Sequence, residues 1–161
     1  MGFIDKIINA VSNQILSRKL HNEARKNAEE CGYTKMGVED IMEVMRDNRG
    51  SAIKINREFT EFMEDFKNHK DEFDDDIYEE TIDTARICTD IYNIYISNVD
   101  DFLEILRDCY FNKTKRERID IPLFAAMCDR GLLLYINSLH ILCDYIADAE
   151  DDDDDEEEDD E

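Results

Sequence analysis

Two rows of carboxylates are the residues of this sequence whose type and spacing could support a chemical interaction. The eight acidic residues are Glu58, Glu61, Glu64 and Asp65 in the first row, and Glu79, Glu80, Asp83 and Asp90 in the second. Glu58, Glu61 and Asp65 follow one another at steps of three and four residues, and Asp83 follows Glu79 at a step of four, which on a helix places a carboxylate about every 5.4 Å turn. Such a face can bind Lys and Arg side chains, so we predict these eight residues as a contact site for a basic protein partner.

Two other interpretations of these rows stay open. A solvated helix face produces the same pattern without any partner. DNA mimicry is the sharper alternative, because a single DNA strand presents a phosphate about every 3.4 Å. One row of carboxylates is too sparse to imitate that spacing, whereas two adjacent rows would approach it.

The sequence offers no pattern typical of an enzyme. Its three histidines, His21, His69 and His140, fall into no HExxH or Cys–His metal spacing. The acidic run 74–76 lacks the glycine and the distal glutamate of an EF-hand loop. Glycine-rich phosphate loops and nucleophile elbows are also missing. We therefore predict a non-enzymatic protein with no catalytic residue, no cofactor and no metal site.

The cysteines indicate a reducing compartment. There are five of them, an odd count without close pairs: Cys31, Cys88, Cys109, Cys128 and Cys143. Residues 1–5 lack the basic start of a secretory signal. We predict buried thiols, with His140, Cys143 and Cys128 as core residues, and a cytoplasmic protein of a bacterium or a host cell.

Net charge limits the choice of partner. The chain carries a formal charge of −23, and the twelve residues 150–161 are all acidic. Such a chain repels nucleic acids and anionic lipids, so we expect no direct nucleic-acid partner and no membrane partner. A nuclease, a defence complex, a toxin or another nucleic-acid-binding protein is the partner that this charge favours. The composition resembles that of DNA-mimic inhibitors, immunity proteins and histone-type chaperones, without a motif that identifies one of them.

The acidic tail and the basic segment 113–118 each have two interpretations. The tail either keeps the protein soluble or acts as an electrostatic arm, which binds a partner or folds back onto the four cations of 113–118. Those four cations, in turn, either belong to a solvated loop or act as a functional patch, which binds phosphate or serves nuclear import.

Hydrophobic periodicity is helical throughout the chain. Apolar residues make up 42% of it, with one proline and five glycines. The predicted helices cover 3–30, 38–48, 51–70, 76–97 and 99–111, one that begins near Pro122, and 132–147. Residues 48–50 and 97–98 supply the predicted breaks, and Gly131 either ends or bends the sixth helix. The expected fold is all-α: one compact bundle of five to seven helices over 1–149, followed by a disordered tail at 150–161.

Apolar surface motivates an alternative function. Ile87, Ile94 and Ile141 are apolar positions beyond those that each helix needs for its core face. They favour a helical scaffold or homo-oligomer that uses an apolar groove, with acidity serving solubility. Residues 3–20 are amphipathic as well, and they either pack into the bundle or lie on a membrane surface.

Overall fold

The computed structural model describes residues 19–156, a chain of helices without a strand in that range. The α-helices are α2 (Lys19–Glu30), α3 (Val38–Asn68), α4 (Asp75–Phe111), α5 (Lys113–Arg118) and α6 (Ile121–Glu156). Two short 3₁₀ helices, η1 (Tyr33–Lys35) and η2 (Lys70–Glu72), lie in the turns before α3 and α4. These elements confirm the predicted helical bundle. None of the described helices combines the length and the apolar character that a membrane crossing requires.

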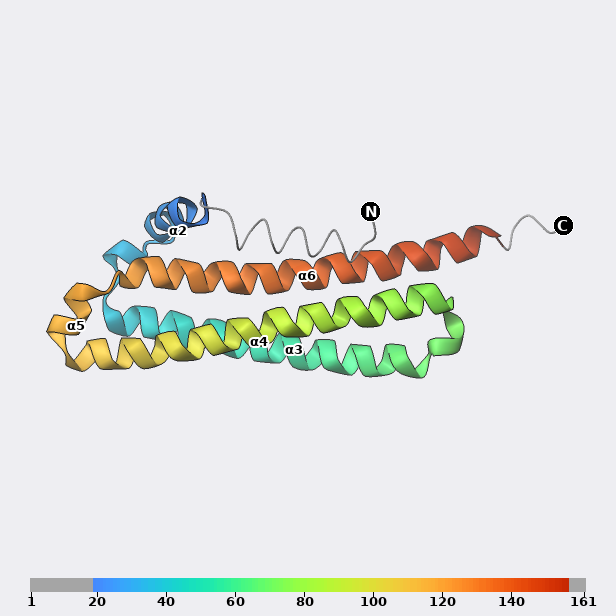
Figure 1. Ribbon diagram of the computed structural model, residues 1–161, viewed down its shortest axis with the longest axis horizontal. Helices are drawn as coiled ribbons and strands as arrows, with labels where there is room; N and C mark the ends of the chain where they lie inside the picture. The colour runs from blue at the N-terminus through green and yellow to red at the C-terminus, as the bar shows by residue number, and fades with distance from the viewer. Residues whose placement is uncertain (1–18, 157–161) are drawn as a thin grey trace.

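Three long helices form the body of the bundle. α3, α4 and α6 lie side by side with alternating direction, and α5 carries the chain from α4 to α6 at one end (Figure 1). The turn with η2 joins α3 to α4 at the opposite end. α2 packs against α6 near the α5 end, and the last part of α6 extends beyond the other helices (Figure 1). We call the two extremities the α5 end and the η2 end.

The predicted breaks inside α3 and α4 are wrong. α3 runs through residues 48–50 without interruption, and α4 runs through 97–98. In each case the apolar stripe continues across the break signal, because Met45 and Ala52 are both buried on α3, as are Tyr95 and Val99 on α4. Burial of these side chains outweighs the weak helix propensity of the glycine, serine and asparagine residues between them.

α5 and α6 also differ from the expected pattern. The segment 113–118 is a short helix rather than a loop, and the Asn112 side chain accepts a hydrogen bond from the Lys115 amide at its start. Pro122 lies in the first turn of α6, as predicted. Gly131 does not end the helix. A Cβ atom at Gly131 would lie 3.4 Å from the Tyr95 ring, so the glycine permits close packing of α6 against α4.

The predictions for the two termini have different outcomes. α6 continues as far as Glu156, so the disordered tail predicted from residue 150 is not confirmed. At 36 residues, α6 is about 54 Å long, and it carries the described part of the tail away from α5. The alternative in which the tail folds back onto the cations of 113–118 therefore finds no support in residues 150–156. Of the helix predicted over 3–30, α2 accounts for the second half, and residues 3–18 lie outside the described residues.

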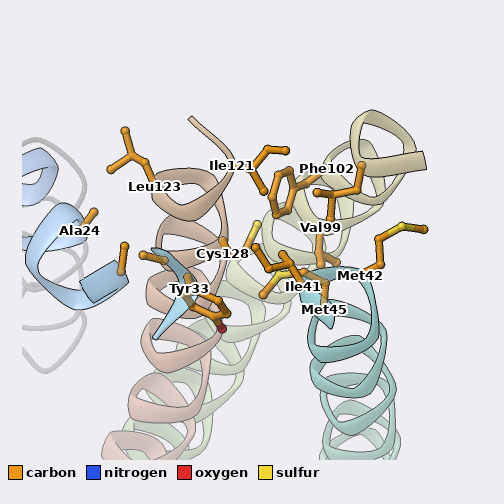
Figure 2. Close-up of a cluster of buried hydrophobic side chains, with 14 of the residues drawn as sticks. Ala24, Tyr33, Ile41, Met42, Met45, Val99, Phe102, Ile121, Leu123 and Cys128 are labelled. Carbon is orange, nitrogen blue, oxygen red and sulfur yellow. The ribbon is translucent and has the colours of Figure 1, made fainter. Parts of the chain in front are cut away.

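The buried side chains form two clusters along the bundle. At the α5 end, one cluster joins α2, η1, the first half of α3, the second half of α4 and the start of α6. Figure 2 shows Ala24 and Leu123 between α2 and α6, and Met45 and Val99 between α3 and α4. Nearer the η2 end, a second cluster joins α3, α4 and α6 around Tyr135.

A buried polar contact fixes η1 and α3 to α6. The Tyr33 hydroxyl donates a hydrogen bond to Asp129 Oδ2 at 2.5 Å, and Asn48 Nδ2 donates to Asp129 Oδ1 at 3.2 Å. Burial raises the pKa of Asp129, and the two hydrogen bonds partly offset that rise. We call these three residues the Asp129 clasp.

Candidate functional site: a groove in the acidic half

Acidic residues gather in one half of the molecule. The contacts Arg49–Asp100 and Asn48–Asp129 lie at the same height along α3, α4 and α6, and we use them as the boundary between the α5 half and the η2 half of the bundle. On the η2 side of this boundary, residues 53–97 hold five Lys or Arg and thirteen Asp or Glu, and residues 131–156 hold nine Asp or Glu and no cation. On the α5 side, residues 19–52 and 98–130 each hold six cations and seven anions. The net negative charge of the described chain thus belongs almost entirely to the η2 half, because cations nearly balance the anions of the α5 half.

A groove of about 860 Å³ runs between α3 and α4 in this acidic half. Four carboxylates line it, Glu64 from α3 and Glu79, Asp83 and Asp90 from α4. On α4, the steps from 79 to 83 and from 83 to 90 keep the three acidic residues on one face of the helix. The antiparallel packing of α3 then brings Glu64 to the same groove.

The structure divides the eight predicted contact residues. Four of them line the groove, while Glu58, Glu61 and Asp65 are exposed on α3 outside it. The eighth, Glu80, lies on a different side of α4, where its carboxylate accepts a hydrogen bond from the Tyr145 hydroxyl of α6 at 2.9 Å. Four of the eight residues thus share the groove, and partner binding by all eight stays a prediction.

The groove also contains cations, which the prediction from the carboxylate rows did not include. Lys67 and Arg86 also line it, and Arg86 Nη1 lies 2.8 Å from Asp83 Oδ1 in an exposed ion pair. An exposed pair of this kind contributes only about 0.2–1 kcal/mol, so an incoming cation can replace it at little cost. The spacing of Asp83 and Arg86, three residues apart, was a signal for this pair that the sequence already contained.

Apolar side chains form the floor of the groove. Phe59 and Met63 of α3 and Tyr78 and Ile82 of α4 line it between the charged groups. The Tyr78 ring stacks on Phe66 with centroids 5.4 Å apart, and this contact secures the floor at the η2 end. The groove can thus receive apolar groups and cations together, which neither carboxylate row alone would indicate.

Among the residues whose side chains the structure describes, no cluster of three or more His, Cys, Asp or Glu could hold a metal ion. Burial raises the pKa of the Cys88 thiol, and it raises that of Cys128 to about 12, which keeps both thiols protonated at neutral pH. The predicted burial is confirmed for Cys88, Cys109 and Cys128. It is wrong for Cys31, Cys143 and His140, which are exposed.

Comparisons with protein-family models, with curated proteins and with solved structures found no match for this chain.

Proposed function

We propose that this chain is a non-enzymatic binding protein whose groove between α3 and α4 receives a basic segment of a protein partner and masks it. The observation that carries the proposal is the groove itself, in which four carboxylates surround an apolar floor. Its position in the half of the molecule that holds most of the negative charge supports the same conclusion.

Binding would use charge and apolar contact together. Lys and Arg side chains of the partner would pair with Glu64, Glu79, Asp83 and Asp90, while their aliphatic stems and neighbouring apolar residues would cover the floor. Since a single exposed ion pair contributes little, affinity would depend on several pairs plus the buried apolar area. The field of the acidic half would raise the association rate at low salt.

The class of partner follows from this chemistry. A nuclease, a defence complex, a toxin or another nucleic-acid-binding protein presents a basic surface built to bind phosphate, and carboxylates can occupy such a surface. The groove carries Lys67 and Arg86 among its carboxylates, so it imitates a DNA strand less closely than two pure acidic rows would. We therefore propose that this chain inhibits a cytoplasmic partner by occupying the partner's basic surface. DNA mimicry is the narrower form of this proposal.

A matched pair of double variants tests the groove. The probe is a labelled helical peptide with arginine and leucine on one face, titrated by fluorescence anisotropy. The double variant Glu79→Gln/Asp83→Asn should weaken binding about three- to twentyfold, because it removes two ion pairs of about 0.2–1 kcal/mol together with charge that steers the peptide. The control Glu58→Gln/Glu61→Gln removes the same charge outside the groove and should change affinity less than twofold.

Two outcomes would contradict the proposal. An equal loss in both double variants would show that diffuse charge, not the groove, holds the peptide. An affinity that stays unchanged between low and high salt would show that the carboxylates contribute nothing.

The apolar floor supports a second candidate, a helical scaffold or homo-oligomer that binds through the groove while its acidity serves solubility. Of the apolar positions that motivate it, Ile94 is exposed, and Ile87 and Ile141 are half-buried. In this case Ile82→Ser would abolish binding or self-association, and salt would have little effect. Sedimentation of the wild type across a range of concentrations, at low and high salt, separates the two candidates.

A further inference from the structure

The α5 end carries an exposed group of aromatic and basic side chains, which we call the basic tip. Tyr110 and Phe111 are the last two residues of α4, and the next helix, α5, has the sequence KTKRER. The six residues of the basic tip are Tyr110, Phe111, Lys113, Lys115, Arg116 and Arg118. The groove described above lies in the opposite half of the molecule, so nothing about this tip depends on it.

Phe111 is unusually exposed for an aromatic side chain without a polar atom. Its exposed fraction is 81%, the largest of any large apolar side chain among the described residues, and Tyr110 is 48% exposed. The two rings meet edge to face with centroids 5.0 Å apart. A phenylalanine contributes to stability only when it leaves water, so a ring placed here gains nothing from the fold of this chain. Phe111 would gain the free energy of transfer out of water only if its ring were buried against another surface.

Two of the four cations of α5 are available for an external anion. Lys115 Nζ lies 3.0 Å from Asp108 Oδ2, and Lys113 Nζ lies 3.9 Å from Glu117 Oε1. Arg116 and Arg118 form no ion pair with any described residue, and guanidinium groups bind phosphate oxygens in a bidentate manner.

The net charge of −23 does not oppose an anionic partner at this tip. The acidic end of α6 lies about 50 Å from α5, because the 36-residue helix α6 separates them. Salt screens charges over about 8 Å at physiological ionic strength, so repulsion from that end is negligible here. The α5 half is nearly neutral, and within it residues 105–118 hold five cations and only two anions, Asp108 and Glu117.

We propose that the basic tip docks on the surface of an anionic lipid bilayer, with the Phe111 ring at the level of the headgroups and Arg116 and Arg118 on lipid phosphates. Exposed aromatic rings beside Lys and Arg are the usual anchors of proteins at the membrane interface. The basic tip lies at one extremity of the elongated bundle, where a flat bilayer surface can reach it (Figure 1).

A nucleic acid fits the basic tip less well. Two unpaired arginines neutralise few phosphates, and binding to a polyanion depends on the number neutralised. The edge-to-face contact of Tyr110 with Phe111 also restricts the ring faces on which bases would stack. The ring and the arginines together suit a lipid surface, which offers both phosphates and an apolar layer.

Vesicle sedimentation tests the proposal on the full chain. Vesicles of phosphatidylcholine with about one third phosphatidylserine should bind the wild type, and pure phosphatidylcholine vesicles should bind it far less, because each basic residue near an anionic surface adds about 1 kcal/mol. Phe111→Ala should reduce partitioning about tenfold, and Arg116→Gln and Arg118→Gln about fivefold each. Phe62→Ala and Arg57→Gln, both exposed on α3, are the matched controls and should bind as the wild type does.

Three results would overturn this assignment. Wild-type protein that fails to bind anionic vesicles at low salt excludes the membrane as the partner. Loss of binding in Ile8→Asp, with the tip variants unaffected, would assign membrane contact to residues 3–20 instead. A labelled single-stranded oligonucleotide that binds more tightly than the vesicles, and is lost with Phe111→Ala, would identify a nucleic-acid site. Phe111 and both arginines are exposed, so circular dichroism of these variants should match that of the wild type.

Discussion

The Asp129 clasp provides the sharpest test of how this fold is held together. Tyr33→Phe removes the hydroxyl that donates to Asp129 and keeps the ring, which is only 3% exposed. The Asp129 carboxylate would then keep a single protein donor, Asn48. A hydrogen bond to a charged group contributes about 1.5–3 kcal/mol, so we expect a loss of that size in the free energy of unfolding. For a domain of this length it corresponds to a melting temperature lower by about 5–12 °C.

Asp129→Asn should behave differently. An asparagine at position 129 can accept from Asn48 with its oxygen and donate to the Tyr33 oxygen with its amide, so both contacts survive. The substitution also removes a charge that burial disfavours, as the raised pKa of Asp129 indicates. At pH 7 we therefore expect this variant to match the stability of the wild type within about 1 kcal/mol, or to exceed it.

The pH dependence supplies an independent check. Because the pKa of Asp129 is higher in the folded chain than in the unfolded chain, the folded chain binds the proton more readily. The wild type should gain stability relative to Asp129→Asn as the pH falls from 7 through the raised pKa, and lose it again as the pH rises.

Urea unfolding followed by circular dichroism, at several pH values between 7 and 4.5, measures these differences. Tyr92→Phe is the control, since the Tyr92 hydroxyl forms no hydrogen bond with the described residues. An Asp129→Asn variant less stable than Tyr33→Phe at pH 7 would contradict the role given to the two hydrogen bonds. A difference between the wild type and Asp129→Asn that does not change with pH would contradict the raised pKa of Asp129.

Two further predictions concern single positions in the helices. The Thr84 hydroxyl is buried and has no hydrogen-bond partner among the described residues, so Thr84→Val should raise the free energy of unfolding by about 1 kcal/mol in urea titrations. Thr89→Val removes a hydrogen bond to the Ala85 carbonyl and should not raise it. Gly50 lies inside α3 with open space around its Cβ position, so Gly50→Ala should raise the melting temperature by about 2–4 °C. Gly32→Ala should lower it, because Gly32 has φ +79°. A stabilising Gly32→Ala would contradict this account of the turn.

Periodicity predicted the helical class and most of the core faces, because one-sided burial leaves a regular pattern in the sequence. The positions around Met63 and Phe66 on α3, and around Cys88 and Ile91 on α4, are buried as that pattern requires. Helix ends were less predictable. The glycine and asparagine signals at 48–50 are local, whereas the continuity of α3 depends on contacts with α4 and α6 that lie far away in the sequence.

The candidate groove was only half predictable for the same reason. The spacing of Glu79, Asp83 and Asp90 places them on one face of α4, but only the packing of α3 against α4 selects Glu64 and leaves Glu61 outside. Periodicity alone places Phe59, Met63 and Ile82 on apolar helix faces, since a sequence does not show where two helices diverge enough to expose such side chains. Phe111 follows Cys109 by two residues, which places it on the face of α4 opposite the buried stripe of Phe102, Leu106 and Cys109, so the periodicity already contained a signal for its exposure.

The division of the core into two clusters has a consequence for how the two ends communicate. Tyr92 and Leu132 are among the few side chains that pack against both clusters, so the ends share a narrow common boundary. Proteins open locally in contiguous cooperative units, and we expect each cluster to form one such unit although α3, α4 and α6 run through both. A ligand held at one extremity would therefore alter amide exchange mainly within its own unit, and occupancy of the groove would leave the affinity of the basic tip nearly unchanged.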